Sequence, residues 1–496
     1  MVNSRVAGVL MPIFSLPSRW GIGRMGSQAE HFIDQLASAK QSIWQILPLG
    51  PTGYGDSPYS SFSTHAGNPY FIDLDELVSW GLLTEDELAS YDWGTNPDRV
   101  DYGKVYQATN PVLKLAFKRA GDPESQPEFR AFTQRTRWLD DYTLFMAIKG
   151  RNQQRSWVDW PDDLRHRDSA AIELVRNQDS EEIAYQAWLQ WIFSMQWNKL
   201  HVYARQAGVK ILGDLPIYVS PDSVDAWANP ELFELDDDLM PITVSGCPPD
   251  GFSAAGQLWN NPIYDWEEHK RTGYVWWAER LSSQLERVDI LRIDHFRGLE
   301  SYYEINAGAS DARKGCWKTG PGMNFFNAMR RHLGNLPLVV EDLGYLTPEV
   351  EQLRKDTGFP GMKLIQFAFD SREGSDYLPH NYYHDCVCYT GTHDNDTVVG
   401  WFDSLSDVDK RRAKIYLNCE LSNPEQIHWK MITCAMTSVA DTCIIPIPDY
   451  LGLGSQGRIN TPAVPDGNWQ WRMRPDALDP ELLARICELT KVTERD

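Results

Sequence analysis

The chain has 496 residues, enough for about two to four average domains or for one large barrel with insertions. It carries 47 Lys and Arg against 69 Asp and Glu, so its formal net charge at pH 7 is −22. This charge argues against nucleic acid, an anionic membrane surface or a polyanionic substrate as the main partner, because each would be repelled. A hydrophobic fraction of 42% and a charged fraction of 23% exclude wholesale disorder.

The aromatic content is high, with 20 Trp, 21 Tyr and 18 Phe. Aromatic rings either fill a core or present flat faces on which a neutral, hydroxylated ligand such as a sugar stacks. Composition alone does not choose between these two uses. The negative charge is compatible with the second, because sugars are uncharged.

The cysteine pattern indicates a reducing compartment. The eight cysteines contain no CxxC pair and no His/Cys zinc spacing. Cys386 and Cys388 fall on one face of an expected strand, as two small buried thiols would. The apolar run Ala7–Phe14 lacks a cleavage site, and no stretch reaches the roughly 18 apolar residues of a membrane span. We therefore expect a soluble, cytoplasmic protein without a membrane partner.

Short apolar runs that end in polar residues recur along the chain, which is typical of buried parallel strands that lead into functional loops. Eight such runs are present: Ala7–Phe14, Ser42–Leu47, Val209–Val219, Asp289–His295, Leu336–Asp342, Met362–Phe369, Cys386–Thr390 and Asp441–Ile447. Amphipathic stretches between them, such as Gln28–Ala39 and Gly322–Leu333, predict helices. The alternation favours an α/β fold, a (β/α)8 TIM barrel with its active site at the carboxyl ends of the strands. A doubly wound open sheet is the alternative, but neither GxGxxG nor GxxxxGK[ST] occurs.

We expect a single catalytic barrel over residues 1–496, with two inserted subdomains. The gap between the second and third strands is far longer than one helix needs, so we place a mostly helical subdomain at 78–207. Within it, Asp179 is expected to cap a long helix. Three tryptophans of that helix are expected to be core residues: Trp188, Trp191 and Trp197. A second insertion, a loop subdomain at 220–274, follows the third strand and is expected to cover the active site.

The fourth strand brings two opposite charges to one face. Side chains alternate along a strand, so Arg292 and Asp294 point the same way and Leu291 points the other way. The guanidinium should lower the pKa of Asp294 and keep the carboxylate ionised, as a nucleophile requires. A structural ion pair explains the same pattern equally well.

The fifth and seventh strands bring further polar groups to the same rim. Glu341 follows an apolar run, and burial there should raise its pKa, which suits a general acid. The adjacent Asp342 should face the opposite way as a structural residue. His393 and Asp394 follow the seventh strand.

Several chemistries remain open for a rim that carries Asp294, Glu341 and Asp394. Metal binding is one, although His295 and His393 lack HxH and HExxH spacing, and we expect no metal site. A serine triad is another, but no GxSxG elbow is present. Two carboxylates in different electrostatic surroundings suit glycoside chemistry, in which one attacks the sugar carbon and the other protonates the departing oxygen.

Long motifs around these carboxylates carry a resemblance to a known family. Arg292–Gly298, Glu341–Gly344 and His393–Thr397 closely resemble the 4-α-glucanotransferase family, also called amylomaltase or disproportionating enzyme (glycoside hydrolase family 77), a relative of the α-amylases. The similarity covers essentially the whole chain and continues through Leu47–Tyr59, Gly213–Val219, Pro248–Asp250, Gly256–Trp259, Asn261–Pro262, Leu451–Gly454 and Gly467–Trp469.

The resemblance implies a role for each matched residue. Asp294 corresponds to the nucleophile, Glu341 to the general acid/base and Asp394 to the carboxylate that holds the sugar hydroxyls. The residues implied in substrate binding are Tyr59, Asp214, Asp250, Gln257, Trp259, Arg292, His295 and His393, with Tyr54 at a second, remote glucan site.

The resemblance also implies the reaction. It is the transfer of α-1,4-glucan segments from a donor maltooligosaccharide to the 4-hydroxyl of an acceptor, with retention, through a covalent glucosyl-enzyme and without a metal or organic cofactor. The expected partners are maltooligosaccharides, amylose or other α-1,4-glucans, and not nucleic acid. An α-amylase-type hydrolase and a non-catalytic glucan-binding protein are the alternatives. Oligomeric state and preferred donor length are not given by the sequence.

Overall fold

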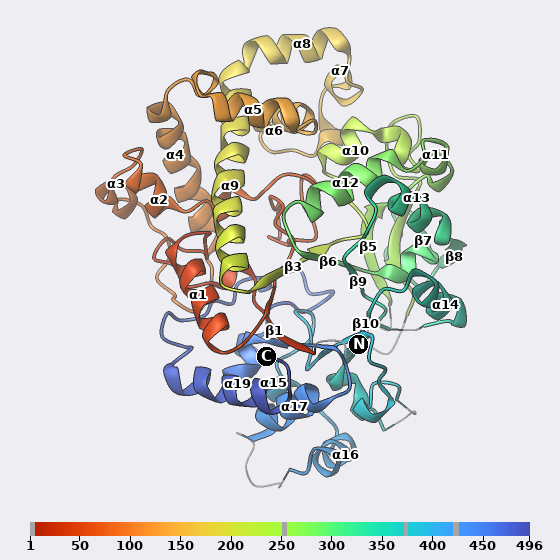
Figure 1. Ribbon diagram of the computed structural model, residues 1–496. Helices are drawn as coiled ribbons and strands as arrows, with labels where there is room; N and C mark the ends of the chain where they lie inside the picture. Colours follow the sequence, from red (N-terminus) through yellow and green to blue (C-terminus); the bar gives the residue numbers. More distant parts are fainter. Residues whose placement is uncertain (1–4, 250–254, 345, 372–374, 420–425) are drawn as a thin grey trace.

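The computed structural model describes residues 5–249, 255–344, 346–371, 375–419 and 426–496 (Figure 1). Parallel strands form an eight-stranded sheet in the order β10-β11-β12-β1-β2-β3-β6-β9, curved into a nearly closed barrel. These strands are β1 (Val6–Leu10), β2 (Ile43–Gln45), β3 (Lys210–Leu215), β6 (Ile290–Ile293), β9 (Leu338–Val340), β10 (Gly361–Leu364), β11 (Cys386–Tyr389) and β12 (Thr442–Pro446). Each overlaps one of the segments predicted from the sequence, so the predicted barrel is confirmed.

Helices cover the outside of the barrel. α1 (Ser27–Ser38) and α13 (Met323–Leu333) coincide with the two helices predicted above, and each buries an apolar stripe. The later helices of this layer are α12 (Val275–Leu285), α14 (Pro348–Thr357), α15 (Val398–Ser404), α16 (Asp407–Leu417), α17 (Ile427–Thr437), α18 (Ile447–Tyr450) and α19 (Pro480–Val492). Between β10 and β11 the described residues form 3-10 turns at Ile365–Phe369 and Pro379–Asn381 in place of a barrel helix.

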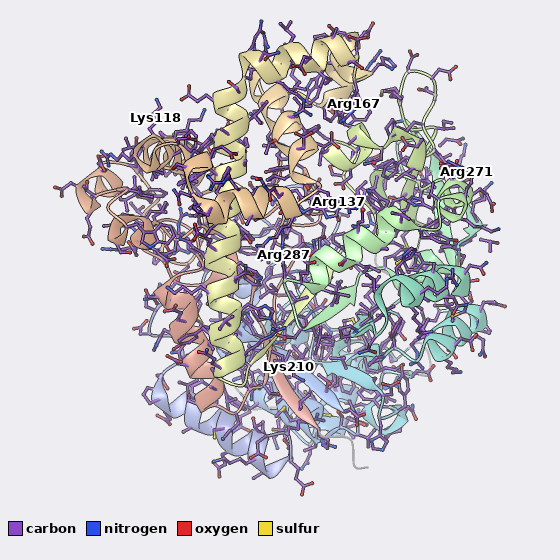
Figure 2. The ribbon with its side chains drawn as sticks, turned by 45° about the horizontal axis from the view of Figure 1, so that its top comes forward. Lys118, Arg137, Arg167, Lys210, Arg271 and Arg287 are labelled. Atoms are coloured by element: carbon purple, nitrogen blue, oxygen red, sulfur yellow. The ribbon has the colours of Figure 1, made fainter. Side chains whose placement is uncertain are left out.

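The segment between β2 and β3 is largely helical. It contains α2 (Leu74–Ser79), α3 (Glu85–Ala89), α4 (Tyr102–Ala120), α5 (Pro127–Arg135), α6 (Leu139–Arg151), α7 (Asp162–Arg165), α8 (Ser169–Gln178) and α9 (Ser180–Gln206). Figure 2 shows Lys118 of α4 and Arg137, which follows α5, on this helical part beside the barrel. The long α9 leads directly into β3 and buries the three tryptophans predicted to be core, Trp188, Trp191 and Trp197.

The start of α9 differs from its prediction. Asp179 occupies the expected capping position, but its side chain makes no bond to the first turn of the helix. Its carboxylate instead pairs with Arg151 at 3.1 Å. The reason is local: α8 ends at Gln178, so Asp179 has φ −109° and ψ 23° instead of the extended backbone that aims a capping side chain at the helix.

A second, smaller sheet lies beside the barrel. It is antiparallel, in the order β5-β4-β7-β8, and combines β4 (Thr243–Cys247) and β5 (Gln257–Pro262) with β7 (Ser301–Asn306) and β8 (Gly315–Thr319). The segment 220–274, predicted as a loop subdomain, contains α10 (Val224–Ala228), α11 (Trp266–Arg271) and two of the four strands of this sheet. Its partner strands follow β6, and nothing in the local sequence could have shown that distant pairing.

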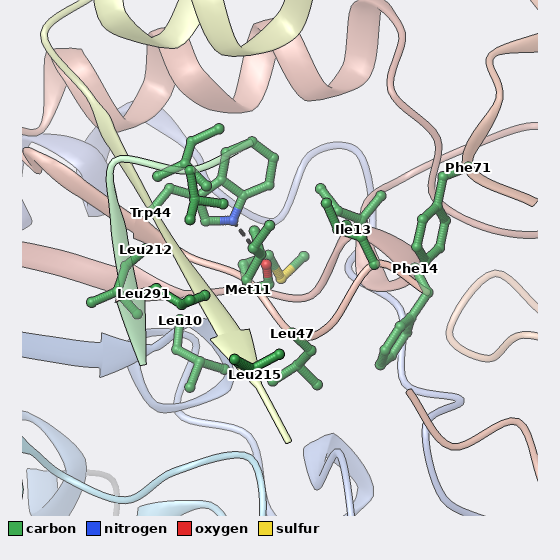
Figure 3. Packing of buried hydrophobic residues seen from close by; sticks show 14 of the residues in the cluster. Leu10, Met11, Ile13, Phe14, Trp44, Leu47, Phe71, Leu212, Leu215 and Leu291 are labelled. Atoms are coloured by element: carbon green, nitrogen blue, oxygen red, sulfur yellow. Dashed lines mark hydrogen bonds between the residues drawn. The ribbon is translucent and has the colours of Figure 1, made fainter. Parts of the chain in front are cut away.

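The barrel and its helices share one apolar core. Figure 3 shows the packing near the amino-terminal strands, where Leu10, Leu212 and Leu291 come from β1, β3 and β6. The buried indole of Trp44 donates from Nε1 to the carbonyl oxygen of Met11 at 2.8 Å, so the ring is both packed and hydrogen-bonded.

All eight cysteines are free thiols, and Cys386 and Cys388 are buried in β11 as predicted. Among the helices in the described ranges, none is both long and apolar enough to cross a membrane.

Arg495 gives a prediction about stability. Its side chain is fully buried and donates to five carbonyl oxygens, those of Val6, Met436, Ser438, Ala440 and Asp441. We expect Arg495→Met to lower the free energy of unfolding by about 3 kcal/mol, because buried acceptors lose their donors.

The measurement is urea unfolding of the variant beside Lys491→Met, which alters an exposed side chain near the end of α19, four residues before Arg495. Equal stability of the two variants would contradict the structural role of Arg495.

Candidate active site

The carboxylates predicted to converge follow the carboxyl ends of barrel strands. β3, β6 and β9 are neighbours in the sheet, so Asp214, Asp294 and Glu341 lie on three adjacent strand ends. Backbone bonds continue the pairing past the strands: Asp294 donates its N–H to the oxygen of Leu215, and Glu341 donates to Ile293, each at 3.0 Å. The positions of these carboxylates are therefore fixed by sheet geometry.

Arg292 links the carboxylates of two strands. Its Nη1 donates to both oxygens of Asp214 at 2.7 Å, and its Nη2 pairs with Asp294 at 2.9 Å. The phenol of Tyr59 donates to Asp214 Oδ2 at 2.7 Å. The Asp214 side chain has 0% exposure against 26% for Asp294. The buried carboxylate of Asp214 therefore orients Arg292 and Tyr59, and its implied contact with a substrate stays a prediction.

Glu341 is held by the backbone of the neighbouring strand end. Its Oε2 accepts the N–H of His295 at 2.7 Å, and its Oε1 accepts that of Leu343 at 3.2 Å. His295 has φ +47°, a left-handed conformation that is costly for a non-glycine residue and aims its N–H at the carboxylate. The imidazole of His295 packs edge-on against Trp259, with 4.8 Å between ring centroids.

Burial changes the acidity of both central carboxyls. It raises the pKa of Asp294 to about 7, with Arg292 opposing the rise and Asp214 adding to it. It raises the pKa of Glu341 to about 8, and the charge of Asp294 adds to this rise. The raised pKa of Glu341 was predicted. The predicted net lowering for Asp294 was wrong, because the loss of surrounding water outweighs the ion pair with Arg292.

The surroundings of the two carboxyls nevertheless differ. Arg292 opposes the rise in the pKa of Asp294, whereas the charge of Asp294 adds to the rise in the pKa of Glu341, which favours a proton on Glu341 near neutral pH. Both flanking imidazoles are neutral there, since burial lowers the pKa of His393 and lowers that of His295 to about 4.

Asp394 approaches from the loop after β11. Its side chain is 42% exposed, and its Oδ2 lies 3.4 Å from Nε2 of His393. Asn460 donates to Asp394 Oδ1 at 2.6 Å, and Arg458 donates to the Asp394 carbonyl at 2.8 Å. Trp469 lies against the His393 ring, with a centroid separation of 6.0 Å.

Sequence reasoning missed Asn460 and Arg458. They lie in a turn-rich stretch more than 60 residues after Asp394, without periodicity or a motif of reactive residues to mark them. Trp469 was noted only as part of a family motif. Its signal in the sequence was a Trp in a Gly-Asn-Trp motif, and such a ring can line a binding site or fill a core.

The other predicted residues fall into three groups. Tyr59 stacks on His393 at 5.2 Å between centroids, and Gln257 accepts the indole N–H of Trp259 at 3.2 Å, so these lie within the site network. Tyr54 is fully exposed on the loop before Tyr59. Asp250 lies outside the described residues. In the part of the chain that the structure describes, no group of three or more His, Cys, Asp or Glu side chains could hold a metal ion.

Comparison with known proteins identifies the family. The family model described as 4-α-glucanotransferase matches residues 11–478. The chain belongs to the 4-α-glucanotransferase family. A 4-α-glucanotransferase of Synechocystis is 46% identical over 100% of this chain and 99% of its own, and one of Clostridium butyricum is 45% identical over 98% and 100%.

Solved structures agree with this assignment. The structure of amylomaltase from Streptococcus agalactiae in complex with acarbose has a TM-score of 0.95 and 39% identity, and covers 99% of both chains. Amylomaltase from Corynebacterium glutamicum, at 19% identity and a TM-score of 0.78 over 99% of this chain and 76% of its own, shares the fold. The architecture of this 4-α-glucanotransferase family member is therefore shared over the full chain.

The raised pKa values predict a pH-dependent cost in stability. A carboxyl whose pKa is raised on folding stabilises the fold below its unfolded pKa of about 4, and this stabilisation is lost as the pH rises through the folded value. For Asp294 and Glu341 the loss extends to about pH 7 and about pH 8. We expect Glu341→Gln to be more stable than the wild type at pH 8 by at least about 1 kcal/mol, with the difference shrinking towards pH 4.

Chemical denaturation at a series of pH values measures this difference. Exposed Glu349→Gln, at the start of α14, is the control: hydrogen bonds to its carboxylate lower the pKa of Glu349, so this variant should gain no stability over the wild type at pH 8. A Glu341→Gln advantage that is constant with pH would contradict the raised pKa.

Proposed function

We propose that Asp294 is the nucleophile and Glu341 the acid/base of a retaining transfer of α-1,4-glucan segments to the 4-hydroxyl of an acceptor sugar. One observation carries the proposal: two carboxyls on adjacent strand ends, of which only Asp294 is paired with a guanidinium, at 2.9 Å. A retaining glycosidase needs one ionised and one protonated carboxyl on the two sides of the reacting bond.

In the first half-reaction the Asp294 carboxylate attacks the anomeric carbon as Glu341 donates its proton to the departing glycosidic oxygen. This gives a covalent β-glucosyl ester on Asp294 and a free glucan with a new 4-hydroxyl. Arg292 stays paired with Asp294 and Asp214 throughout, which keeps the attacking oxygen aligned.

In the second half-reaction Glu341 removes the proton from the 4-hydroxyl of an incoming sugar. That oxygen displaces Asp294 from the anomeric carbon and restores an α-1,4 bond, so one bond is exchanged for an equal one. Asp394, with its partly exposed carboxylate fixed by Asn460, is suited to hold two sugar hydroxyls while the ring flattens.

Transfer instead of hydrolysis requires that a sugar reach the intermediate before water does. The inserted segment 220–274 is proposed to cover the active site and limit water, and Trp259 and Tyr59 offer rings for the sugar. The acarbose bound to the Streptococcus agalactiae relative supports a glucan-like ligand in this chain as well.

Partners and location follow from the same reasoning. Neutral α-glucans need no electrostatic steering, so a net charge of −22 does not hinder their binding, whereas it disfavours nucleic acid. The eight free thiols support the proposal of a cytoplasmic location.

The product pattern tests the transferase against the hydrolase. Incubation with maltotriose alone should give glucose together with maltodextrins longer than the substrate, because each cleaved bond is re-formed on another chain. The measurement is chromatographic separation of the products combined with an assay of reducing ends. A rise in reducing ends in proportion to the bonds cut would favour the α-amylase-type hydrolase.

Substitution of each carboxyl tests the assigned roles. We expect Asp294→Ala and Glu341→Gln each to lower kcat by at least about 1,000-fold, because one step loses its nucleophile and the other its proton donor. Activity is measured with maltotriose, and circular dichroism checks the fold. Glu349→Gln, which changes an exposed carboxyl at the start of α14, is the matched control, and wild-type rates in either active-site variant would refute the assignment.

A further inference from the structure

The barrel is closed at one seam by a side chain. Among the described residues, β9 and β10 lie at the two ends of the sheet order and share no ladder of paired residues. One backbone bond joins them, from the N–H of Val340 to the oxygen of Pro360 at 3.0 Å. At the amino ends of the strands, the segments Leu336–Val339 and Thr357–Pro360 both line a cavity of about 450 Å³.

Asp342 makes the next connection across this seam. Its Oδ1 accepts the N–H of Met362 in β10 at 2.6 Å, where a continuous ladder would use a backbone carbonyl. Its Oδ2 lies 3.5 Å from Nε of Arg354 on α14, and the side chain is only 6% exposed. A buried carboxylate therefore ties the end of β9 to both β10 and the helix between them.

Gly361 leaves room for this carboxylate. A Cβ on Gly361 would lie 2.3 Å from Asp342 Oδ2 and 2.7 Å from its Cγ, far inside van der Waals contact. Gly361 does not have a positive φ, so its role here is space and not backbone conformation. The strand β10 and the carboxylate of Asp342 fit together only because this position lacks a side chain.

The seam bears on the chemistry because Asp342 is adjacent to Glu341. On its other side, the backbone of Glu341 is tied to β6 and to the turn that follows it. Its N–H donates to the carbonyl oxygen of Ile293 at 3.0 Å, and its carbonyl oxygen accepts the N–H of Phe296 at 3.1 Å. The backbone that carries Glu341 is thus clamped between β6 and β10, and Asp342 provides the clamp towards β10. A displacement of about 1 Å at a reacting group costs about 100-fold in rate.

We propose that Asp342 is a positioning residue, which replaces the missing β9–β10 ladder and thereby sets the place of the Glu341 carboxyl relative to the glycosidic oxygen. The inference rests on the acid/base role proposed above for Glu341. It gives Asp342 and Gly361 a part in the reaction although both residues are buried.

A glycosyl donor whose leaving group needs no proton separates a misplaced Glu341 from a general loss of substrate binding or folding. With α-maltosyl fluoride, Asp294 forms the ester as fluoride leaves without a proton, and azide then displaces Asp294 to give α-maltosyl azide without help from a base. Azide therefore restores turnover when only the function of Glu341 is impaired. A variant that has lost substrate binding or Asp294 gains nothing from azide.

We expect Asp342→Ala to lower kcat/KM with maltotriose by about 100-fold, mostly through kcat, and azide to raise its turnover of α-maltosyl fluoride by at least about tenfold. Glu341→Gln should respond to azide in the same way, and Asp294→Asn should not. Asp342→Asn keeps the acceptor for Met362 N–H and should retain activity within about tenfold of the wild type. Thermal unfolding confirms that each variant is folded.

Gly361→Ala is a second route to the same result if Asp342→Ala does not fold, because it displaces the carboxylate without removing it. Its control is Gly150→Ala in α6, where the nearest atom to a new Cβ lies 4.0 Å away. A folded Asp342→Ala or Gly361→Ala with wild-type activity, or one impaired but unresponsive to azide, overturns the positioning role.

The controls separate this proposal from the one on which it rests. If Glu341→Gln is not rescued by azide, the acid/base assignment fails and the role of Asp342 fails with it. If Glu341→Gln is rescued and the seam variants are not, only the inference about the seam is wrong.

Discussion

The active site depends on a single buried guanidinium. Arg292 is bound to Asp214 by two contacts of 2.7 Å and to Asp294 by one of 2.9 Å, and its side chain is only 3% exposed. A buried cation is tolerable only when its charge is neutralised, so the arginine requires one carboxylate on the neighbouring strand β3 and one at the end of its own strand β6. This requirement couples Asp294, the proposed nucleophile after β6, to the end of β3 and, through Tyr59, to the loop after β2.

The two sides of the site are built by different means. Asp294 and Glu341 follow strands and are fixed by backbone bonds that extend the sheet, which gives the reacting carboxyls a rigid base. Asp394 comes from a loop and is fixed by side chains of a second loop, through Asn460 and the rings of Tyr59, His393 and Trp469. A rigid side suits the groups that exchange a covalent bond, and a side made of loops suits a group that follows the changing shape of the sugar.

Burial of these carboxyls is unfavourable for folding and useful for catalysis. The same loss of solvent that raises the pKa values of Asp294 and Glu341 keeps a proton on Glu341 near neutral pH. The surrounding fold must supply the stability that the site loses, and the common core of barrel, helices and insertion offers it.

The sequence by itself determined the barrel, and it supplied the residues that we propose to react. Apolar runs such as Leu338–Val340 predict strands because of their composition. The carboxyl ends of parallel strands meet at one rim of a barrel, so the polar residues after these runs must lie there. Only the tertiary structure decided how those residues are connected. The pairing of β4 with β7, the bond from Asn460 to Asp394 and the carboxylate at the β9–β10 seam join segments far apart in the chain. The pKa of Asp294 also depends on the tertiary structure. The nearby Arg292 predicts a lowered pKa, and the pKa is raised only because the whole fold buries the carboxyl deeply.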